Sequence, residues 1–346
     1  MKFLSVCSGI EAASVAWHPL GWESVAYSEI EPFPCKVLQH HYPDVPNLGD
    51  MTKFKEWPDA DVDVFVGGTP CQSFSVAGLR KGLDDPRGNL MLTYLAIAKR
   101  YRPNWLVWEN VPGVLSSAGG RDFGSLLGGL AECGYGFAYR VLDAQYFGVA
   151  QRRRRVFVVG YLGDWRPAAA VLFERHSLQG HPAPSREKGQ RPTASTSASP
   201  VYGGSDANTS DTVTSKWAKG SGGPAGNECG LFVAQPIALA ENTIGRKPEN
   251  GGNGDGVTEN GPMYTLNATG VHGVAQAMAV RRLTPVECER LQGFPDRYTD
   301  IQPKGKPTPD GPRYKALGNS MAVPVMAWIG KRIQEVDAIC KTQQKQ

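Results

Sequence analysis

Two short apolar runs, each followed at once by polar residues, constrain the fold of this chain more than any other feature. The first run lies at residues 62–66 and the second at residues 105–108. Runs of this length, bounded by turn residues, are typical of buried strands. The first run leads to Cys71 and the second to Glu109, and the carboxyl ends of parallel strands meet at the sheet edge where ligands bind. The sequence therefore predicts that a thiol and a carboxyl group share one edge of an α/β sheet.

Gly67, Gly68 and Pro70 separate the first run from Cys71. Two glycines permit a tight backbone turn, and proline fixes its own φ and restricts the residue before it. A cysteine presented on such a turn is a candidate nucleophile; the alternative is a small, buried and unreactive thiol. The polar stretch 72–89 that follows contains three glycines. This composition is typical of a mobile lid, or of an ordinary surface loop.

The amino terminus has the pattern of a strand, a glycine turn and a helix. We expect a strand at residues 3–6, a helix at Glu11–Leu20 that ends at Gly21, and then a second strand. A glycine turn before a helix amino terminus favours a bound carboxylate or phosphate. Glu29, about 20 residues after the turn, is placed to accept hydrogen bonds from ribose hydroxyls, and Glu31 is the alternative.

A run of four arginines follows Gln151 and continues into four apolar residues. On charge alone, the run is a solvated basic segment. Its apolar continuation favours a strand, in which successive side chains point to opposite faces. Arg153 and Arg155 would then share one face of the strand, and Arg152 and Arg154 would share the other.

Two further helices are expected near the carboxyl terminus. Thr284, Pro285 and Glu287 form a capping box with proline at the first helical position, so a helix should start there and end near Gly293. A second, apolar helix follows residues 318–321.

Composition limits the class of protein. The chain has 346 residues, of which 41% are hydrophobic and 20% charged, and a formal net charge of +4. This length is sufficient for two domains, and the charge permits a nucleic-acid partner. With no apolar run of about 18 residues and no signal sequence, we expect no membrane span and a cytoplasmic protein. The seven cysteines are scattered without zinc spacing, which predicts reduced thiols and no metal.

Three motifs, in this order, resemble those of the DNA (cytosine-5) methyltransferase family of bacteria and phages. They are Pro70-Cys71-Gln72, Trp108-Glu109-Asn110-Val111 and Gln151-Arg152-Arg153-Arg154-Arg155. The resemblance covers about residues 1–165 and 280–335. It implies a Rossmann-like, mostly parallel sheet with helices on both faces, and S-adenosylmethionine as the cofactor of a stand-alone modification enzyme.

The resemblance also implies roles for the residues of the predicted edge. Cys71 would add to carbon 6 of a flipped-out cytosine, Glu109 would serve ring nitrogen 3, and Arg155 would bind the base carbonyl. Arg153 would help to keep Cys71 as a thiolate. The residues that would line the base pocket are Pro70, Gln72, Asn110 and Val111.

A larger set of residues is implied for the cofactor. It comprises Cys7, Ser8, Gly9, Ile10, Glu29, Ile30, Asp50, Met51, Gly68, Pro70, Leu90, Asn319 and Ser320. The family loop usually reads Phe-x-Gly-x-Gly. Here the corresponding residues 7–11 keep Gly9 but have neither the aromatic residue nor the second glycine.

Three segments are expected along the chain. Residues 1–175, completed by 310–346, form the catalytic and cofactor-binding domain, and residues 281–309 form a supporting helix and a connection. Residues 176–280 are rich in Gly, Pro, Ser, Thr and Asn, which is typical either of a disordered linker or of a small, loop-rich domain. By the resemblance, this segment is the target-recognition domain.

Other functions compete with this interpretation. A relative that modifies RNA would share the motifs, and a DNA-binding protein that has lost catalysis would share the fold. The retention of Cys71, Glu109, Arg153 and Arg155 disfavours the second, and the absence of G-x-G-x-x-G disfavours a dehydrogenase. The expected partner is double-stranded DNA, the expected state is a monomer, and a cognate restriction endonuclease in a separate chain is compatible with the sequence.

Overall fold

The computed structural model describes residues 1–69, 90–173, 279–302 and 305–343, together with three short strands at 237–239, 257–258 and 273–276. The chain divides into two compact units. The first unit comprises Met1–Arg186, Pro262–Gly270 and Leu283–Gln346, and the second comprises Glu187–Gly261 and Val271–Arg282.

A six-stranded sheet in the order β2-β1-β3-β4-β6-β5 forms the centre of the first unit. Its strands are β1 (Lys2–Val6), β2 (Glu23–Ser28), β3 (Val64–Gly67), β4 (Trp105–Asn110), β5 (Tyr135–Asp143) and β6 (Arg154–Leu162). The pairs β1–β2, β1–β3 and β3–β4 are parallel, whereas β6 is antiparallel to both β4 and β5. The mostly parallel sheet is therefore confirmed, with β6 as its reversed strand.

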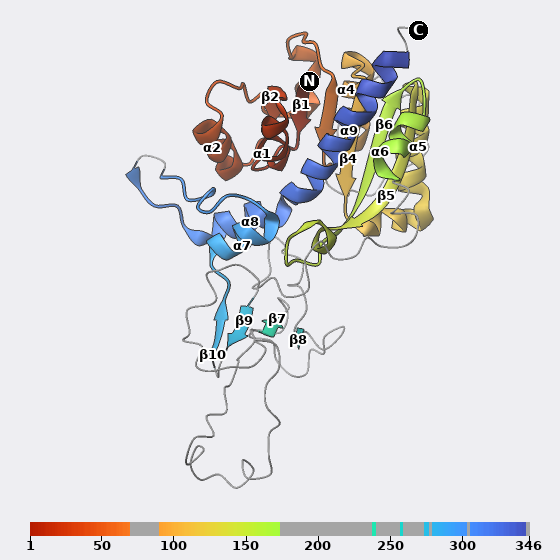
Figure 1. Ribbon diagram of the computed structural model, residues 1–346. Helices are drawn as coiled ribbons and strands as arrows, with labels where there is room; N and C mark the ends of the chain where they lie inside the picture. Colours follow the sequence, from red (N-terminus) through yellow and green to blue (C-terminus); the bar gives the residue numbers. More distant parts are fainter. Residues whose placement is uncertain are drawn as a thin grey trace, which may run out of the picture. The chain divides into compact units, whose positions relative to one another are not determined.

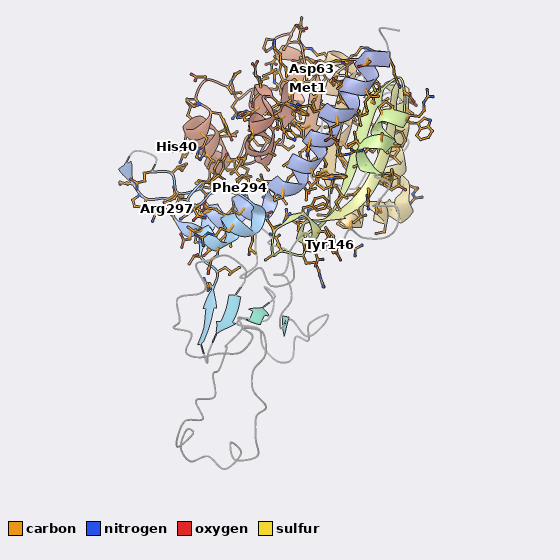
Figure 2. All side chains as sticks on the ribbon, viewed as in Figure 1. Met1, His40, Asp63, Tyr146, Phe294 and Arg297 are labelled. Carbon is orange, nitrogen blue, oxygen red and sulfur yellow. The ribbon has the colours of Figure 1, made fainter. Side chains whose placement is uncertain are left out.

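The two apolar runs form the neighbouring strands β3 and β4, as the sequence predicted. Gly67 at the end of β3 lies opposite Trp108 in β4, so Glu109 extends just beyond it at the carboxyl edge. Figure 2 labels Met1 and Asp63 at the amino end of the sheet and Tyr146 at the opposite, carboxyl edge. This edge contains the candidate site.

The helices of the first unit lie between and after these strands. They are α1 (Ala12–Trp17), α2 (Pro32–His41), α4 (Leu90–Tyr101), α5 (Arg121–Glu132), α6 (Arg166–Leu172), α7 (Pro285–Gln292), α8 (Asp310–Asn319) and α9 (Val323–Gln343). Short 3-10 turns are η1 (His18–Leu20), η2 (Met51–Glu56), η4 (Pro112–Leu115), η5 (Ser117–Gly120) and η6 (Ala144–Phe147). The prediction of one regular helix over Glu11–Leu20 was wrong. α1 gives way to η1, because Pro19 lacks a backbone N–H.

Helices cover both faces of the sheet. On one face, α4 and α5 pack on apolar side chains that include Phe65, Leu106 and Val158. On the other face, α1, α6 and α9 pack together, and Figure 1 shows α9 lying across the sheet. The indole of Trp105 in β4 donates to Asp337 Oδ1 of α9 at 3.0 Å. Successive side chains of β4, Trp105 and Leu106, thus contact the helices on opposite faces of the sheet.

The last helix of the chain is fixed to the first. Trp17 Nε1 in α1 donates to the carbonyl of Met326 at 2.8 Å, and Trp22 Nε1 donates to Gln334 Oε1 at 3.0 Å. Both acceptors belong to α9. Among the described residues, no helix has the length and hydropathy required to span a membrane.

The predicted capping box is present at the start of α7. Thr284 N donates to Glu287 Oε2 at 2.7 Å, and Glu287 N donates to Thr284 Oγ1 at 3.3 Å. Gly293 ends the helix with φ of 79°, in the left-handed region where glycine is favoured. Both predicted limits of this helix are confirmed.

The second unit contains a four-stranded antiparallel sheet in the order β10-β9-β7-β8. Its strands are β7 (Ile237–Leu239), β8 (Val257–Thr258), β9 (Gly273–Gln276) and β10 (Ala279–Arg282). Most of the segment 176–280 lies outside the described residues. The assignment of target recognition to it remains a prediction.

Candidate active site

A buried ion pair joins β4 and β6 at the carboxyl edge of the sheet. Arg155 Nε lies 3.0 Å from Glu109 Oε1, and both side chains are mostly buried. Because β6 runs antiparallel to β4, the first residues of β6 lie beside the last residues of β4. The reversed direction of β6 therefore brings an arginine at the start of one strand to a glutamate at the end of another.

Burial and the neighbouring arginines have opposite effects on the pKa of Glu109. Burial raises the pKa of this carboxyl above its ordinary value, while the positive charges of Arg155 and Arg153 oppose the rise. The net direction is upward, because desolvation disfavours the charged form of the carboxyl group. Glu109 therefore holds a proton more firmly than an exposed glutamate does.

Arg153 and Arg155 point into the protein, whereas Arg152 and Arg154 are exposed, as the alternation predicted. Regular pairing starts only at Arg154, so Arg153 lies just before β6. Its side chain is 2% exposed, and Nη2 donates to the carbonyls of Gly318 at 3.0 Å and Ser320 at 2.6 Å. Burial lowers the pKa of Arg153 to about 9.

The end of β3 is held by residues of β4. Asn110 Nδ2 donates to the carbonyl of Thr69 at 2.8 Å, and Trp108 Nε1 donates to Thr69 Oγ1 at 3.0 Å. These bonds fix the backbone two residues before Cys71. Pro70, Cys71, Gln72 and the expected lid lie outside the described residues.

Gly67 and Gly68 allow close packing, and the tight turn expected after them continues into residues outside the described part of the chain. Neither residue has a positive φ. A Cβ on Gly67 would lie 2.7 Å from the carbonyl oxygen of Val6. A Cβ on Gly68 would lie 3.0 Å from Glu109 Oε2 and 3.4 Å from Met321 Cε. Gly68 therefore leaves room for the carboxyl group of Glu109.

The predicted cofactor loop joins β1 to α1 and is bound to the end of β2. Gly9 has φ of 57°, and its N–H donates to Glu29 Oε2 at 2.8 Å. Glu29 Oε1 accepts from the N–H groups of Ile30 and Glu31, each at 2.7 Å. Ser8 N donates to the carbonyl of Ser28 at 3.2 Å. The acidic residue thus closes the loop before any ligand binds.

Two sulfur atoms meet beside this loop. Cys7 Sγ lies 3.6 Å from Met51 Sδ, and burial raises the pKa of the Cys7 thiol to about 12. Cys7, at the position where the family pattern has an aromatic residue, is thus a neutral thiol that contacts a buried thioether. Asp50 accepts from Thr52 N at 2.9 Å and so caps η2. Its role in cofactor binding remains a prediction.

The remaining predicted residues differ in accessibility. Ile30 is 68% exposed, whereas Ile10 is fully buried. Val111 and Asn319 are exposed, and Leu90 is the first residue of α4. The structure therefore groups Gly68, Glu109 and Arg155 at one position, and Gly9 and Glu29 at another.

Two residues of the loop region were not predicted. Glu11 is buried in a left-handed turn and caps α1, and Tyr298 donates its hydroxyl to the carbonyl of Ile10 at 2.9 Å. A glutamate at a position where the family pattern has glycine was an available signal for Glu11. Nothing in the sequence signals Tyr298. Across the described part of the chain, no group of three or more His, Cys, Asp and Glu side chains could hold a metal ion.

Comparison with protein families and curated proteins gives consistent matches. The profile of the family "C-5 cytosine-specific DNA methylase" matches residues 1–335. The DNA N-6-adenine-methyltransferase of Escherichia phage P1 is 36% identical over 97% of this chain, and the chain spans only 61% of that relative's length. The Type II methyltransferase M.HpaII of Haemophilus parainfluenzae is 29% identical over 96% of this chain and 89% of its own length.

Solved structures with the same fold include two methyltransferases. The S. pombe Dnmt2 methyltransferase has a TM-score of 0.56 at 15% identity, and the match covers 97% of this chain and 98% of that one. The Entamoeba histolytica methyltransferase EhMeth has a TM-score of 0.55 at 16% identity, with the same coverage. At these identities the likeness concerns the fold, and it agrees with the six-stranded sheet.

Proposed function

Because the chain belongs to the family of C-5 cytosine-specific DNA methylases, we propose that it transfers a methyl group from S-adenosylmethionine to carbon 5 of cytosine in duplex DNA. The observation that carries the proposal is the buried pair of Glu109 and Arg155 at 3.0 Å, beside the strand that leads to Cys71. A carboxyl group with a raised pKa and a guanidinium group at one sheet edge suit a base that accumulates negative charge.

Cys71 is the proposed nucleophile. Its thiolate forms a bond to carbon 6, and the ring electrons make carbon 5 nucleophilic. After carbon 5 has gained the methyl group, with a neutral thioether as the leaving group, it loses its proton to solvent. The electrons of that C–H bond restore the ring double bond as the bond between Cys71 and carbon 6 breaks. The thiolate is regenerated, so the cysteine takes part without being consumed.

Glu109 and Arg155 are proposed to act on the ring during the addition. Protonated Glu109 would donate a hydrogen bond to ring nitrogen 3, where charge develops. Arg155 would bind the carbonyl oxygen of the base and stabilise the same charge. Because the target lies within a stacked duplex, the base must first rotate out, at a cost of a few kcal/mol that contacts in the pocket offset.

The cofactor loop suits S-adenosylmethionine, which supplies an electrophilic methyl group on a sulfonium. A carboxylate has about four acceptor positions, and Glu29 uses three of them for the backbone N–H groups of Gly9, Ile30 and Glu31. One position on Oε2 is left for a ribose hydroxyl. The exposed side chain of Ile30 provides an apolar surface next to it.

Target recognition is proposed for residues 176–280, and double-stranded DNA is the proposed partner. Loop side chains that read base edges in the major groove would select the site. The net charge of +4 is compatible with binding to phosphates. A monomer suffices for this proposal, with or without a cognate endonuclease in a separate chain.

Adenine is the second candidate substrate, because the phage P1 relative has the name DNA N-6-adenine-methyltransferase. An exocyclic amine has its own nucleophilic nitrogen and needs no covalent activation, so a nucleophilic cysteine would have no purpose. That relative extends well beyond the matched part, since the chain spans 61% of its length. Cytosine is therefore the better-supported base.

Expression in a host that lacks DNA methylation tests both candidates. Mass spectrometry of hydrolysed DNA and bisulfite sequencing should find 5-methylcytosine within one short motif. Cys71→Ser should abolish it while S-adenosylmethionine still binds, and Cys340→Ser, at a remote cysteine in α9, should leave it unchanged. Undiminished methylation by Cys71→Ser would refute the mechanism, and N6-methyladenine alone would favour the second candidate. Unmodified DNA despite soluble expression would direct the test to tRNA.

A further inference from the structure

Glu11 has a backbone conformation that glutamate rarely adopts. It lies between β1 and α1 with φ of 62° and ψ of 60°, in the left-handed region that glycine favours. A residue with a Cβ keeps such a conformation where its surroundings determine it strongly. We therefore expect contacts of the Glu11 side chain to stabilise this backbone conformation.

The carboxyl group of Glu11 ties the strand before the turn to the helix after it. Oε2 accepts from Ser14 N at 3.1 Å and from Ser14 Oγ at 2.5 Å, in the first turn of α1. Oε1 accepts from the hydroxyl of Ser5 in β1. The residue is 1% exposed, so water does not compete for these bonds. Three hydrogen bonds to the buried carboxyl group thus oppose the unfavourable φ.

Neighbouring residues of the loop are anchored by other elements. Gly9 N is bound by Glu29 at the end of β2, and the carbonyl of Ile10 accepts from Tyr298, which follows α7. Glu11 is the last residue of the loop before α1 begins, and its own side chain anchors it. Hydrogen bonds from other elements therefore hold the loop in a defined conformation.

Burial and hydrogen bonding have opposite effects on the pKa of Glu11. Burial raises the pKa of Glu11 to about 7, although the bonds from the two serines oppose the rise, and the Glu29 carboxylate raises it further. The other titratable groups that face it are Tyr27 of β2, Tyr42 after α2 and Tyr298. Burial raises the pKa of each hydroxyl, for Tyr42 to about 12, so all three are neutral at ordinary pH.

The network continues from Glu11 toward η1. Ser14 Oγ lies 2.9 Å from the hydroxyl of Tyr27 and 3.2 Å from Ser24 Oγ, and His18 Nε2 lies 2.8 Å from Ser24 Oγ. Burial lowers the pKa of His18. Serine hydroxyls donate to a carboxylate and accept from a carboxyl group. The network can therefore satisfy Glu11 in either state of ionisation.

Given the proposed use of S-adenosylmethionine, we propose that Glu11 is the positioning residue of the cofactor loop. It holds the left-handed turn in place of a glycine, and its carboxyl group loses a proton when the cationic cofactor binds. The sign follows from electrostatics, because a positive sulfonium favours the ionised form of a nearby acid. Below neutral pH, binding therefore releases a proton from Glu11 to solvent.

Calorimetry of S-adenosylmethionine binding, in two buffers of different ionisation enthalpy, tests both parts of the proposal. The wild-type protein should release up to one proton at pH 6 and none at pH 9. Glu11→Gly should bind S-adenosylmethionine within about threefold of the wild-type affinity, because glycine adopts the turn freely. Glu11→Gln, which has no carboxyl group, should lose the proton release. Glu11→Ala should bind about tenfold more weakly, which corresponds to about 1.4 kcal/mol.

The outcomes separate this inference from the proposed function. A wild-type protein that binds no S-adenosylmethionine would refute the proposed function. Wild-type binding with equal affinities for Glu11→Ala and Glu11→Gly would show that the side chain does not hold the turn. Proton release that persists in Glu11→Gln would overturn the assigned proton. If Glu11→Ala fails to fold by thermal melting, the Gly and Gln variants still decide the proton release.

Discussion

Removal of Arg155 should destabilise the protein strongly, and more at high pH than at low pH. Its guanidinium lies 3.0 Å from Glu109 Oε1, and both side chains are mostly buried. Arg155→Met retains a long apolar side chain but leaves a buried carboxyl without this cation. The cost should therefore come from the unpaired charge rather than from a cavity.

The distance sets the expected magnitude. At 3.0 Å and an effective dielectric constant of about 20, the attraction is about 5.5 kcal/mol before desolvation is considered. Breaking a buried pair by removal of one partner costs about 3–5 kcal/mol. We therefore expect Arg155→Met to lower the free energy of unfolding by about 3–5 kcal/mol at pH 8.

The pH dependence follows from the direction of the pKa of Glu109. Burial already raises this pKa in the folded protein, so the folded state binds more protons than the unfolded state, and stability falls as pH rises through the folded-state pKa. Without Arg155, the pKa rises further. As the pH is lowered from 8 to 5.5, the destabilisation of Arg155→Met relative to wild type should then shrink. In the range where Glu109 titrates, the free energy of unfolding changes by about 1.4 kcal/mol per pH unit.

Urea unfolding followed by tryptophan fluorescence is a suitable assay, because Trp105 and Trp108 are buried in β4. Arg154→Met, at the neighbouring exposed arginine, is the matched control and should change stability by about 0.5 kcal/mol at most. A loss for Arg155→Met that matches this control, or that is the same at both pH values, would refute the reasoning.

Two further substitutions test packing at the edge and the start of α7. Gly68→Ala should reduce methyl transfer by about 10–100-fold with little change in melting temperature. The added Cβ would lie 3.0 Å from Glu109 Oε2 and displace this carboxyl group. Normal turnover in steady-state kinetics would contradict this prediction. Thr284→Ala removes the capping box and should cost about 1 kcal/mol in urea unfolding, and unchanged stability would show that the cap contributes nothing.

Local sequence signals predicted the elements whose pattern needs no distant partner. The apolar runs gave β3 and β4 because continuous burial leaves few alternatives to a strand. Thr284 and Glu287 identified the start of α7 because both halves of a capping box lie within one turn. The parallel pairing of β3 and β4 then followed from fold-level rules for α/β sheets.

Long-range geometry could not be read from the same patterns. The direction of β6 depends on its pairing with β4 and β5, which lies outside any local window. The sequence suggested backbone freedom at Gly68, but it could not show that Glu109, a residue 41 positions away in the chain, lies against this glycine. For Glu11, local preference argues against a left-handed turn, and tertiary hydrogen bonds override it.

The two arginines of the edge have different partners, which explains why the site needs the end of the chain. Arg155 meets Glu109, whereas Arg153 donates to the carbonyls of Gly318 and Ser320 at the carboxyl end of α8. A cation there also interacts favourably with the helix dipole. The backbone then enters α9, where the carbonyl of Met326 accepts a hydrogen bond from the indole of Trp17 at the end of α1. One carboxyl-terminal segment therefore braces the catalytic edge and the helix that supports the cofactor loop, so neither is complete without residues 310–343.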